Sequence, residues 1–273
     1  MTARQTILIT GATDGLGRRV AERLASPDVL LLVHGRNAER GRSLVDEIAA
    51  EGGQAQFYQA DFDALDAVRA VAAAIAADHA HIDVHVNNAG IAVVDGTRRL
   101  SADGCERHFA VNYLAAFLFT ESLLPRLGGA RASRVINVAS AGQHAIDFSN
   151  VMLEREYAGF RAYAQSKLAD IMYAFDLAQM RAETNIASTA LHPATLMDTP
   201  MVRATGMTPV SSVESGADAL LALVHASDDA INGRYFDELR ASRANPQAYD
   251  IEARQALRRL SLALTGLEDR SHS

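Results

Sequence analysis

Two tyrosines in the stretch "YAGFRAYAQSKLAD" (157–170) are each followed four residues later by a cation. On a helix, residues four apart lie on the same face one turn apart, so a phenol and a cation at this spacing can interact. A phenol has an ordinary pKa of about 10, and a neighbouring ammonium lowers it toward the range useful for proton transfer. We predict that Tyr163 and Lys167 form such a pair. Tyr157 and Arg161 are not expected to, because a guanidinium cannot lose its charge and Gly159 interrupts the helical pattern.

A glycine-rich turn near the N-terminus is the second feature with a chemical interpretation. "ILITGATDGLGRRVAERLA" places Gly11, Gly15 and Gly17 between an apolar strand and an amphipathic helix, with the spacing G-x-x-x-G-x-G. Glycines in such a turn let backbone N–H groups approach a pyrophosphate at the helix N-terminus. An ordinary strand-helix turn is the alternative, but the strand before it and the helix after it favour a nucleotide site.

The elements that must position these residues follow from the hydrophobic pattern. Strands are predicted at 6–10, 28–33, 54–60, 82–86, 133–140 and 185–191, and helices at 16–26, 38–50, 63–78, 102–127 and 161–182. Alternation sustained over this length predicts an α/β fold, a Rossmann-type doubly wound parallel sheet with helices on both faces. No repeat or linker-like segment divides the chain, so residues 1–273 are expected to form a single domain.

Several motifs in a fixed order give the sequence a family resemblance. "TGATDGLG" (10–17) resembles the glycine motif of the short-chain dehydrogenase/reductase family, and "NNAG" (87–90) resembles the segment after its fourth strand. "HPAT" (192–195) stands where the family usually has a Pro-Gly pair, with Ala194 in place of the glycine. The stretches "HGRNAERG", "FAVNYLAAFLFT", "INVASAGQ" and "AYAQSKLA" are similar to the branch that contains retinol dehydrogenases. The resemblance spans nearly the whole chain and implies an oxidoreductase.

The resemblance implies a catalytic tetrad of Asn112, Ser140, Tyr163 and Lys167. Tyr163 would be the general acid/base for hydride transfer between a nicotinamide cofactor and a carbonyl/alcohol pair, and Lys167 would also bond the nicotinamide ribose. Ser140 would hold the substrate oxygen, and Asn112 would anchor a water relay. Taken singly, Ser140 could instead cap a turn at a strand end, and Asn112 could bond helix backbone.

The cofactor contacts of the family also transfer to this sequence by resemblance. The implied cofactor-binding residues are Gly11, Thr13, Asp14, Gly15, Leu16, Gly17, Arg36, Asn37, Asp61, Phe62, Asn88, Ala89, Gly90, Tyr163, Lys167, Pro193 and Thr195. Asn87 and Ala89 are expected to hold the adenosine half through backbone contacts, with Asp61 near the adenine. Asp61 has an alternative role as a neighbour of a helix N-cap. Thr195 is expected to reach the carboxamide or the phosphates.

The end of the second predicted strand indicates which nicotinamide cofactor is preferred. NAD-dependent enzymes usually place a carboxylate there to accept hydrogen bonds from the ribose hydroxyls. The stretch "LLVHGRN" has no Asp or Glu, and Arg36 is positioned to pair with a 2′-phosphate. We therefore expect NADP(H) rather than NAD(H). Asp14 weighs against this expectation, because many NADP-dependent relatives carry a basic residue at that position.

Two segments are expected to border the substrate. Twenty-two residues separate Ser140 from Tyr163, against about a dozen usual in the family, and the extra stretch at about 143–160 resembles an insertion of the retinol dehydrogenase-like branch. The substrate loop is expected at about 195–213 and carries Met197, Met201 and Met207. Methionines adapt to irregular apolar shapes, so the expected substrate is a small molecule of the hydrophobic, fairly bulky carbonyl or secondary alcohol kind. The alternative is that these methionines only pack the loop.

Composition excludes several other classes of protein. Of 273 residues, 49% are apolar and 22% charged, as in a soluble globular protein, and the net charge of -7 argues against nucleic-acid binding. Cys105 is the only cysteine, so neither an intrachain disulfide nor a cysteine-based metal cluster can form. No metal-ligand spacing, signal-like N-terminus or apolar run long enough to span a membrane is found, and a cytoplasmic location is expected.

Two further expectations concern assembly and function. The predicted helices at 102–127 and 161–182 resemble those that dimerise in the family, so a homodimer is possible, although they are also needed to cover the sheet. The main competing function is a non-catalytic NADP(H)-binding sensor or partner-binding module on the same fold. A nucleotide-sugar epimerase or dehydratase is disfavoured, because such enzymes usually carry a T-G-x-x-G-x-x-G pattern and a longer C-terminal domain.

Overall fold

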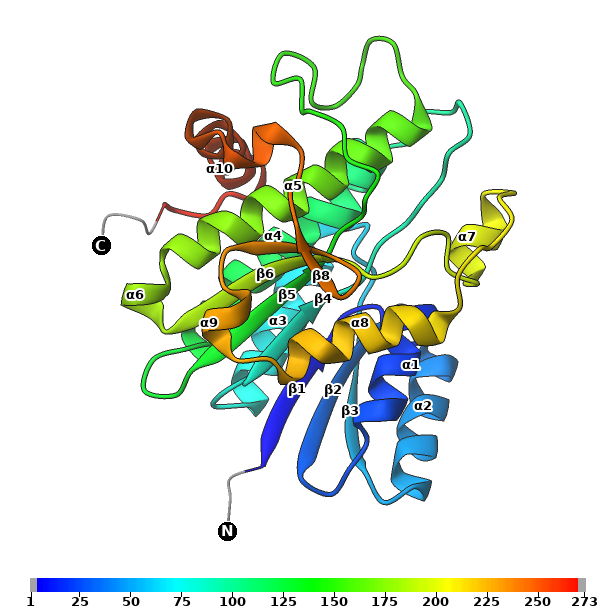
Figure 1. Cartoon of the computed structure of the whole chain (residues 1–273), viewed down its shortest axis with the longest axis vertical. Coiled ribbons are helices and arrows are strands. Elements are labelled where there is room, and N and C mark those ends of the chain that lie inside the picture. Colours follow the sequence, from blue (N-terminus) through cyan, green and yellow to red (C-terminus); the bar gives the residue numbers. More distant parts are fainter. Residues whose placement is uncertain (1–3, 270–273) are drawn as a thin grey trace.

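The computed structural model describes residues 4–269, and within this range eight strands form one sheet (Figure 1). Their order is β3-β2-β1-β4-β5-β6-β7-β8, and all neighbours are parallel except β7 and β8. The strands are β1 (Gln5–Ile9), β2 (Val29–Gly35), β3 (Gln54–Gln59), β4 (Val84–Asn87), β5 (Ser133–Val138), β6 (Ile186–His192), β7 (Arg234–Asp237) and β8 (Arg240–Ser242). The predicted doubly wound parallel sheet is confirmed.

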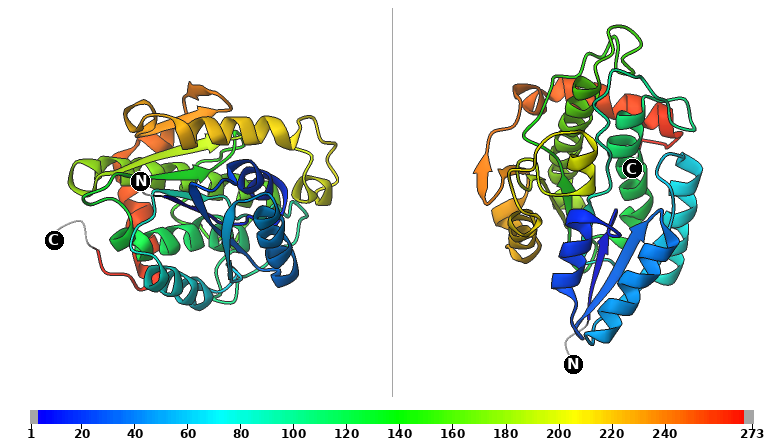
Figure 2. Two further views of the ribbon diagram at one scale, coloured as in Figure 1. Left: turned by 90° about the horizontal axis from the view of Figure 1, so that it is seen from below. Right: turned by 90° about the vertical axis from the view of Figure 1, so that its right-hand side faces the viewer.

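Helices cover both faces of this sheet (Figure 2). One face carries α1 (Gly15–Leu24), α2 (Ala38–Ala50) and α8 (Val213–His225), and the other carries α3 (Leu65–Asp78), α4 (Ala115–Leu123) and α5 (Gly159–Gln179). The shorter elements are a π-helical turn η1 (Phe109–Leu114), the 3-10 turns η2 (Leu124–Arg126) and η3 (Pro246–Tyr249), and the helices α6 (Arg181–Thr184), α7 (Pro200–Ala204) and α9 (Asp228–Ile231). The last described helix is α10 (Ile251–Thr265). No helix of residues 4–269 is long and apolar enough to cross a membrane.

The central strand β1 shows why the sheet is buried on both faces. Successive side chains of a strand point to opposite faces. Ile7 and Ile9 accordingly belong to the core under α1, α2 and α8, whereas Leu8 belongs to the core under α3, α4 and α5. A strand that is apolar at every position is therefore what a central parallel strand requires.

The strand order reverses beside β1, which pairs with β2 on one side and with β4 on the other. The chain first builds outward to β3 and then returns to add β4 and the later strands. In doubly wound sheets, the loops at such a switch point diverge and leave a crevice at the carboxyl ends of the strands. The predicted site residues should therefore gather along this edge.

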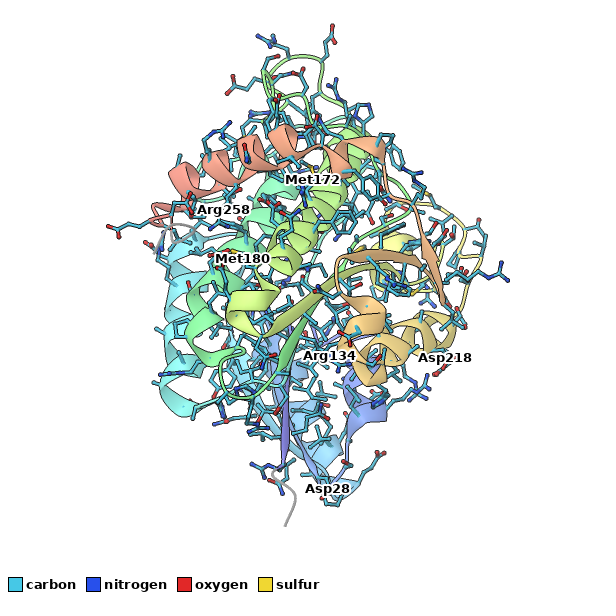
Figure 3. The ribbon with its side chains drawn as sticks, turned by 60° about the vertical axis from the view of Figure 1, so that its left-hand side comes forward. Asp28, Arg134, Met172, Met180, Asp218 and Arg258 are labelled. Atoms are coloured by element: carbon cyan, nitrogen blue, oxygen red, sulfur yellow. The ribbon has the colours of Figure 1, made fainter. Side chains whose placement is uncertain are left out.

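Helix α10 lies across α5 (Figure 3). Leu257 and Leu262 are buried, Arg254 pairs with Asp176 of α5 at 3.4 Å, and Arg258 reaches Glu121 of α4 at 3.4 Å. The outer side of α4 and α5 is thus partly occupied by the chain's own helix. A homodimer formed through these two helices would have to accommodate α10.

The predicted helix at 102–127 begins later than expected. Residues 102–105 form a turn in which Gly104 adopts a φ of +78°, and Ser101 Oγ accepts from the N–H of Cys105 at 3.4 Å. The helix then starts with the π-helical turn η1 and ends at η2. The other predicted elements shift by no more than about three residues at an end, as helix and strand ends commonly do. Helix α8, strands β7 and β8, and α10 were not among the predicted elements.

Candidate active site

The glycine turn between β1 and α1 packs directly on the segment after β4. Gly11 adopts a φ of +63°, and a Cβ there would lie 2.8 Å from Ala89 Cα. A Cβ at Gly17 would lie 2.5 Å from both Asn88 Nδ2 and Gly11 O. Thr10 Oγ1 accepts from the N–H groups of Asn88 and Ala89 at 2.9 and 3.0 Å, and Asn88 Nδ2 donates to Thr10 O at 2.8 Å. Only glycine fits this interface, which holds the start of α1 at the crevice.

Charged side chains flank the first turn of α1 and the end of β2. Asp14 caps α1 by accepting from the N–H of Gly15 at 2.8 Å, and its other oxygen pairs with Arg40 at 2.5 Å. Asn37 caps α2 by accepting from the N–H of Arg40 at 2.9 Å. Arg36 is exposed directly after β2, and within residues 4–269 no carboxylate pairs with it. The carboxylate of Asp14, which weighs against a 2′-phosphate, is therefore already paired with a guanidinium.

His34 lies beneath the glycine turn and joins it to the end of β3. Its ring stacks on Phe62 with 4.1 Å between centroids, Nδ1 accepts from the N–H of Gly11 at 3.4 Å, and Nε2 donates to Ala60 O at 3.2 Å. Burial lowers the pKa of His34 to about 4, so the ring is neutral and can accept from Gly11. The side chains of Phe62 and Leu16 are buried in the core, so either residue can reach a ligand only through its backbone.

Asn112 lies in the π-helical turn η1, a kind of element that is frequent at functional sites. Its Oδ1 accepts from the N–H of Ile91 at 2.7 Å, and Nδ2 donates to Ile91 O at 3.1 Å and to Ser166 Oγ at 2.9 Å. The side chain therefore ties η1 to α5 and to the segment after β4. A Cβ at Gly90 would lie 3.2 Å from Asn112 Oδ1 and 3.7 Å from Lys167 Nζ, so these three predicted residues meet at one point.

Lys167 lies one helical turn after Tyr163 in α5 and is only 6% exposed. Its Nζ donates to Val138 O at 2.8 Å, at the end of β5, and pairs with Asp170 Oδ2 at 3.0 Å. Burial is the largest single influence and disfavours the ammonium, but the charge of Asp170, the interaction with Tyr163 and the hydrogen bond to Asp170 together outweigh it, so the pKa of Lys167 is raised. Tyr163 is partly exposed and meets the ring of His108 edge-on at 6.3 Å between centroids. The predicted phenol is therefore accessible and stands beside a fixed cation.

Ser140 follows β5 and borders the same edge of the sheet. Its Oγ accepts from the N–H of Gly142 at 3.0 Å, and its carbonyl accepts from Tyr235 OH at 3.2 Å. The hydroxyl proton of Ser140 remains available for donation to another group. A Cβ at Gly142 would lie 3.5 Å from both Ser140 Oγ and the ring of Phe160, so an exposed aromatic ring lies close to this serine.

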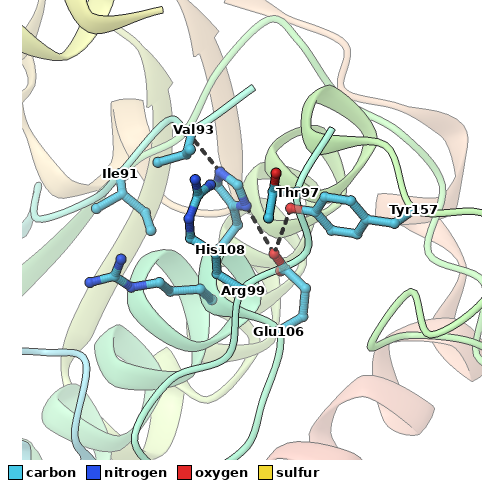
Figure 4. Close-up of a pocket in the computed structure, with 8 residues that line it drawn as sticks. Ile91, Val93, Thr97, Arg99, Glu106, His108 and Tyr157 are labelled. Atoms are coloured by element: carbon cyan, nitrogen blue, oxygen red, sulfur yellow. Dashed lines mark hydrogen bonds and ion pairs between the residues drawn. The ribbon is translucent and has the colours of Figure 1, made fainter. Parts of the chain in front are cut away.

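Tyr157 lies before α5, in a small pocket with Glu106 and His108 (Figure 4). Its hydroxyl donates to Glu106 Oε1 at 3.3 Å, and His108 Nδ1 shares that oxygen at 2.9 Å while Nε2 accepts from the N–H of Val93 at 2.9 Å. Burial, together with the Glu106 carboxylate, raises the pKa of Tyr157 to about 12. This phenol therefore keeps its proton near neutrality, and since it is not helical it does not face Arg161 across one helical turn.

The loop after β6 contains the last predicted contacts. His192, the last residue of β6, is buried, and its Nε2 bonds Thr195 Oγ1 at 3.1 Å. Pro193 is buried and Thr195 is exposed. Leu196 adopts a φ of +44°, where a side chain is strained, and its carbonyl accepts from the N–H of Val210 at 3.0 Å. The chain thus turns sharply into a loop that is closed at its base.

Some predicted residues use their side chains for contacts within the fold. Asn87 is buried, and its Nδ2 donates to Thr120 and Asn137 at 2.9 and 3.0 Å, so its side chain serves the core. The carboxylate of Asp61 accepts from the N–H of Asp63 at 3.1 Å, shortly before α3, as the alternative interpretation expected. Thr13 lies against Gly35, where a Cβ would be 2.5 Å from Thr13 Cγ2.

Three buried charged or titratable residues of the site were missed. Asp170, Glu106 and His108 are each at most 4% exposed. Their sequence signal is only a spacing: Asp170 comes three residues after the lysine, and His108 comes two residues after Glu106. Burial is needed to recognise them. Within the described part of the chain, no group of His, Cys, Asp and Glu side chains could hold a metal ion.

Comparison with known proteins places this site in a family. The model of the short chain dehydrogenase family matches residues 5–209. Human retinol dehydrogenase 12 is 29% identical over 277 aligned residues, covering 96% of this chain and 87% of that protein. A solved structure of an uncharacterised protein from Mycobacterium paratuberculosis superposes with a TM-score of 0.80 at 28% identity, covering 97% and 95% of the two chains. A short chain dehydrogenase from Burkholderia cenocepacia in complex with NADP superposes with a TM-score of 0.68 at 27% identity, covering 85% and 95%.

The family match covers the glycine turn, η1, β5 and the helix that carries Tyr163 and Lys167. The residues that the sequence singled out for chemistry thus lie inside the matched region and along one edge of the sheet. The chain belongs to the short-chain dehydrogenase/reductase family of oxidoreductases, in its retinol dehydrogenase-like branch.

Proposed function

We propose that this protein is an NADP(H)-dependent oxidoreductase that interconverts a hydrophobic carbonyl compound and the corresponding secondary or primary alcohol, with Tyr163 as the general acid/base. The observation that carries the proposal is the placement of Lys167. Its ammonium is buried and fixed by Val138 O at 2.8 Å, one helical turn from the accessible phenol of Tyr163. Asn112 and Gly90 lie beside it, and Ser140 follows the strand that supplies the carbonyl.

The residues present fit a nicotinamide dinucleotide. Gly11 and Gly17 leave no room for a Cβ at the start of α1, so backbone rather than side chains lines the approach to that helix N-terminus. The helix N-terminus favours a pyrophosphate, and the exposed guanidinium of Arg36 suits a 2′-phosphate. The NADP complex of the Burkholderia cenocepacia protein supports the same cofactor class.

The chain's own residues would then divide the chemistry. Bound NADPH would supply the hydride that reduces the carbonyl carbon. Tyr163 donates its hydroxyl proton to the carbonyl oxygen as the C=O double bond becomes a single bond, and Ser140 donates a hydrogen bond to the same oxygen. Lys167 stabilises the phenolate that remains, which regains a proton from solvent. In the oxidative direction each transfer is reversed.

Exposed apolar side chains in two segments support a hydrophobic substrate. Phe148 and Phe160 are 37% and 57% exposed in the 143–160 segment, and Met201 and Met207 are each 37% exposed in the loop after β6. Met197 is different, because its sulfur fills the space over Gly216. Met197 therefore packs the loop, whereas Met201 and Met207 give the loop an accessible apolar surface.

A substrate panel tests the proposal. Purified protein is mixed with NADPH and apolar ketones, aldehydes and quinones, and loss of nicotinamide absorbance is followed. We expect turnover of bulky apolar carbonyls and little turnover of small, highly charged ones. Tight NADPH binding without turnover across a broad panel would favour the non-catalytic sensor instead.

Cofactor preference is tested at Arg36. Arg36→Ala should lower kcat/KM with NADPH by about 10- to 100-fold, the usual worth of a charge-assisted hydrogen bond, and leave the value with NADH unchanged. Arg42→Ala is the matched control, because Arg42 is exposed like Arg36 but lies on α2, away from the end of β2. Equal or better kcat/KM with NADH in the wild type, or unchanged NADPH use in Arg36→Ala, contradicts the assignment.

A further inference from the structure

Asp170 is a buried carboxylate in direct contact with the proposed catalytic lysine. It lies one turn after Lys167 in α5, is 4% exposed, and its Oδ2 is 3.0 Å from Lys167 Nζ. An ammonium has three N–H donors. One is taken by Val138 O and a second by Asp170, so the third is left for the side where Tyr163 stands.

We propose that Asp170 is a positioning residue that holds Lys167 as an oriented cation, with one N–H left for the side where Tyr163 stands, and so sets the pH range over which the site transfers a proton. This inference rests on the proposed function and adds a residue to it. It concerns the rate and pH range of each direction and not the overall equilibrium, which no enzyme residue can change.

The electrostatic surroundings make Asp170 the carboxylate that compensates Lys167. The phenol of Tyr113 and the amide of Asn112, both in η1, face the side of α5 that carries Asp170 and Ser166. The carbonyl of Val138, at the end of β5, contacts Lys167. The charged groups farther along form pairs of their own: Glu121 with Arg258, Asp176 with Arg254, and, beside Tyr163, Glu106 with His108. Removing Asp170 would therefore leave the Lys167 ammonium buried without a compensating carboxylate.

The charge of Asp170 opposes proton loss from Lys167. Burial works against the ammonium of Lys167, and Asp170 is the main charge that raises its pKa. The carboxylate lies 3.0 Å from the ammonium, so its charge acts on Lys167 directly.

Asp170→Asn tests the inference because it keeps the shape and removes the charge. In the holoenzyme, the alkaline limb of kcat/KM for NADPH-dependent reduction should move to lower pH by about one unit, since proton loss from Lys167 becomes easier. In the protein without cofactor, the tyrosinate absorbance that Tyr163→Phe removes is a second readout of the charge on Lys167, and its midpoint in Asp170→Asn should differ from that of the wild type.

Three further variants complete the design. Asp176→Asn is the matched control, since it removes a carboxylate from the same helix six residues farther on and should leave both midpoints unmoved. Asp170→Glu retains the charge and should restore wild-type midpoints. Asp170→Ser repeats the charge removal if Asp170→Asn does not fold.

The outcomes separate this inference from the proposed function. Unmoved midpoints in Asp170→Asn, or equal shifts in Asp176→Asn, overturn the role of Asp170 even where Tyr163→Phe has lost turnover. Full turnover by Tyr163→Phe instead overturns the proposed function itself.

Discussion

His85 lies in β4 with none of its surface exposed, and its ring meets Phe119 edge-on at 5.5 Å between centroids. Burial lowers its pKa from 6.5 to about 4. Between these two values the unfolded chain binds a proton at this position and the folded chain does not. Folded-state stability is therefore complete above the unfolded pKa and is lost as pH falls toward the folded pKa. His85→Leu fills the same apolar site without a group that titrates.

The size of the effect follows from the shift. The free energy of unfolding of His85→Leu relative to wild type should rise by about 2 kcal/mol between pH 7.5 and pH 5, because the unfolded histidine is then mostly protonated and the folded one is not. The difference between the two proteins is the informative quantity. Burial raises the pKa of Asp170 and of Asp176 to about 6, and these carboxyl groups change stability in the opposite direction over the same range.

Urea unfolding followed by circular dichroism at pH 7.5, 6 and 5 measures this difference. His225→Gln is the control, since it removes a histidine that is exposed at the end of α8 and is therefore not subject to the burial that acts on His85. A His85→Leu difference that stays constant to within about 0.5 kcal/mol across this range would refute the linkage argument.

Other positions give independent tests of the packing. Gly17→Ala should weaken NADPH binding at least about ten-fold, because its Cβ would lie 2.5 Å from Asn88 Nδ2 and Gly11 O. Fluorescence titration measures the affinity, and the circular dichroism spectrum should stay unchanged. Wild-type affinity would contradict the proposed role of the glycine turn. Gly128→Ala should lower the Tm by several degrees, since its φ is +67° and a Cβ would lie 1.9 Å from Thr184 O. Gly52→Ala, at φ +82° with open space around it, should cost less, and equal losses would contradict the steric explanation.

Much of the fold was predictable because its strands and helices have distinct hydrophobic periods. Strand β1 is apolar at three consecutive positions, Ile7, Leu8 and Ile9, so both of its faces are apolar. Helix α1 shows the helical period directly after the glycine turn. The start of the helix that carries Asn112 was not predictable in this way. Residues 102–105 have a composition that a helix tolerates, and only the positive φ of Gly104 and the bond to Ser101 set the later start.

The pairing of Tyr163 with Lys167 was predictable because a local spacing on one helix fixes it. The contribution of Asp170 was not, because spacing alone does not show that this carboxylate is buried and pairs with Lys167. The same holds for Glu106, whose carboxylate bonds both His108 and Tyr157. These two residues come from segments about fifty residues apart, so the role of Glu106 is recognisable only when the segments are packed together.

The role of Tyr163 is tested most directly by Tyr163→Phe, assayed with NADPH and an apolar ketone that the wild type reduces. The variant removes the phenolic proton and keeps the ring, so kcat should fall by about 10²- to 10⁴-fold. Its affinity for NADPH should be largely retained, and Tyr157→Phe should keep nearly all of kcat, since Tyr157 bonds Glu106 outside the helix. Turnover that survives in Tyr163→Phe and is abolished in Tyr157→Phe would contradict the account.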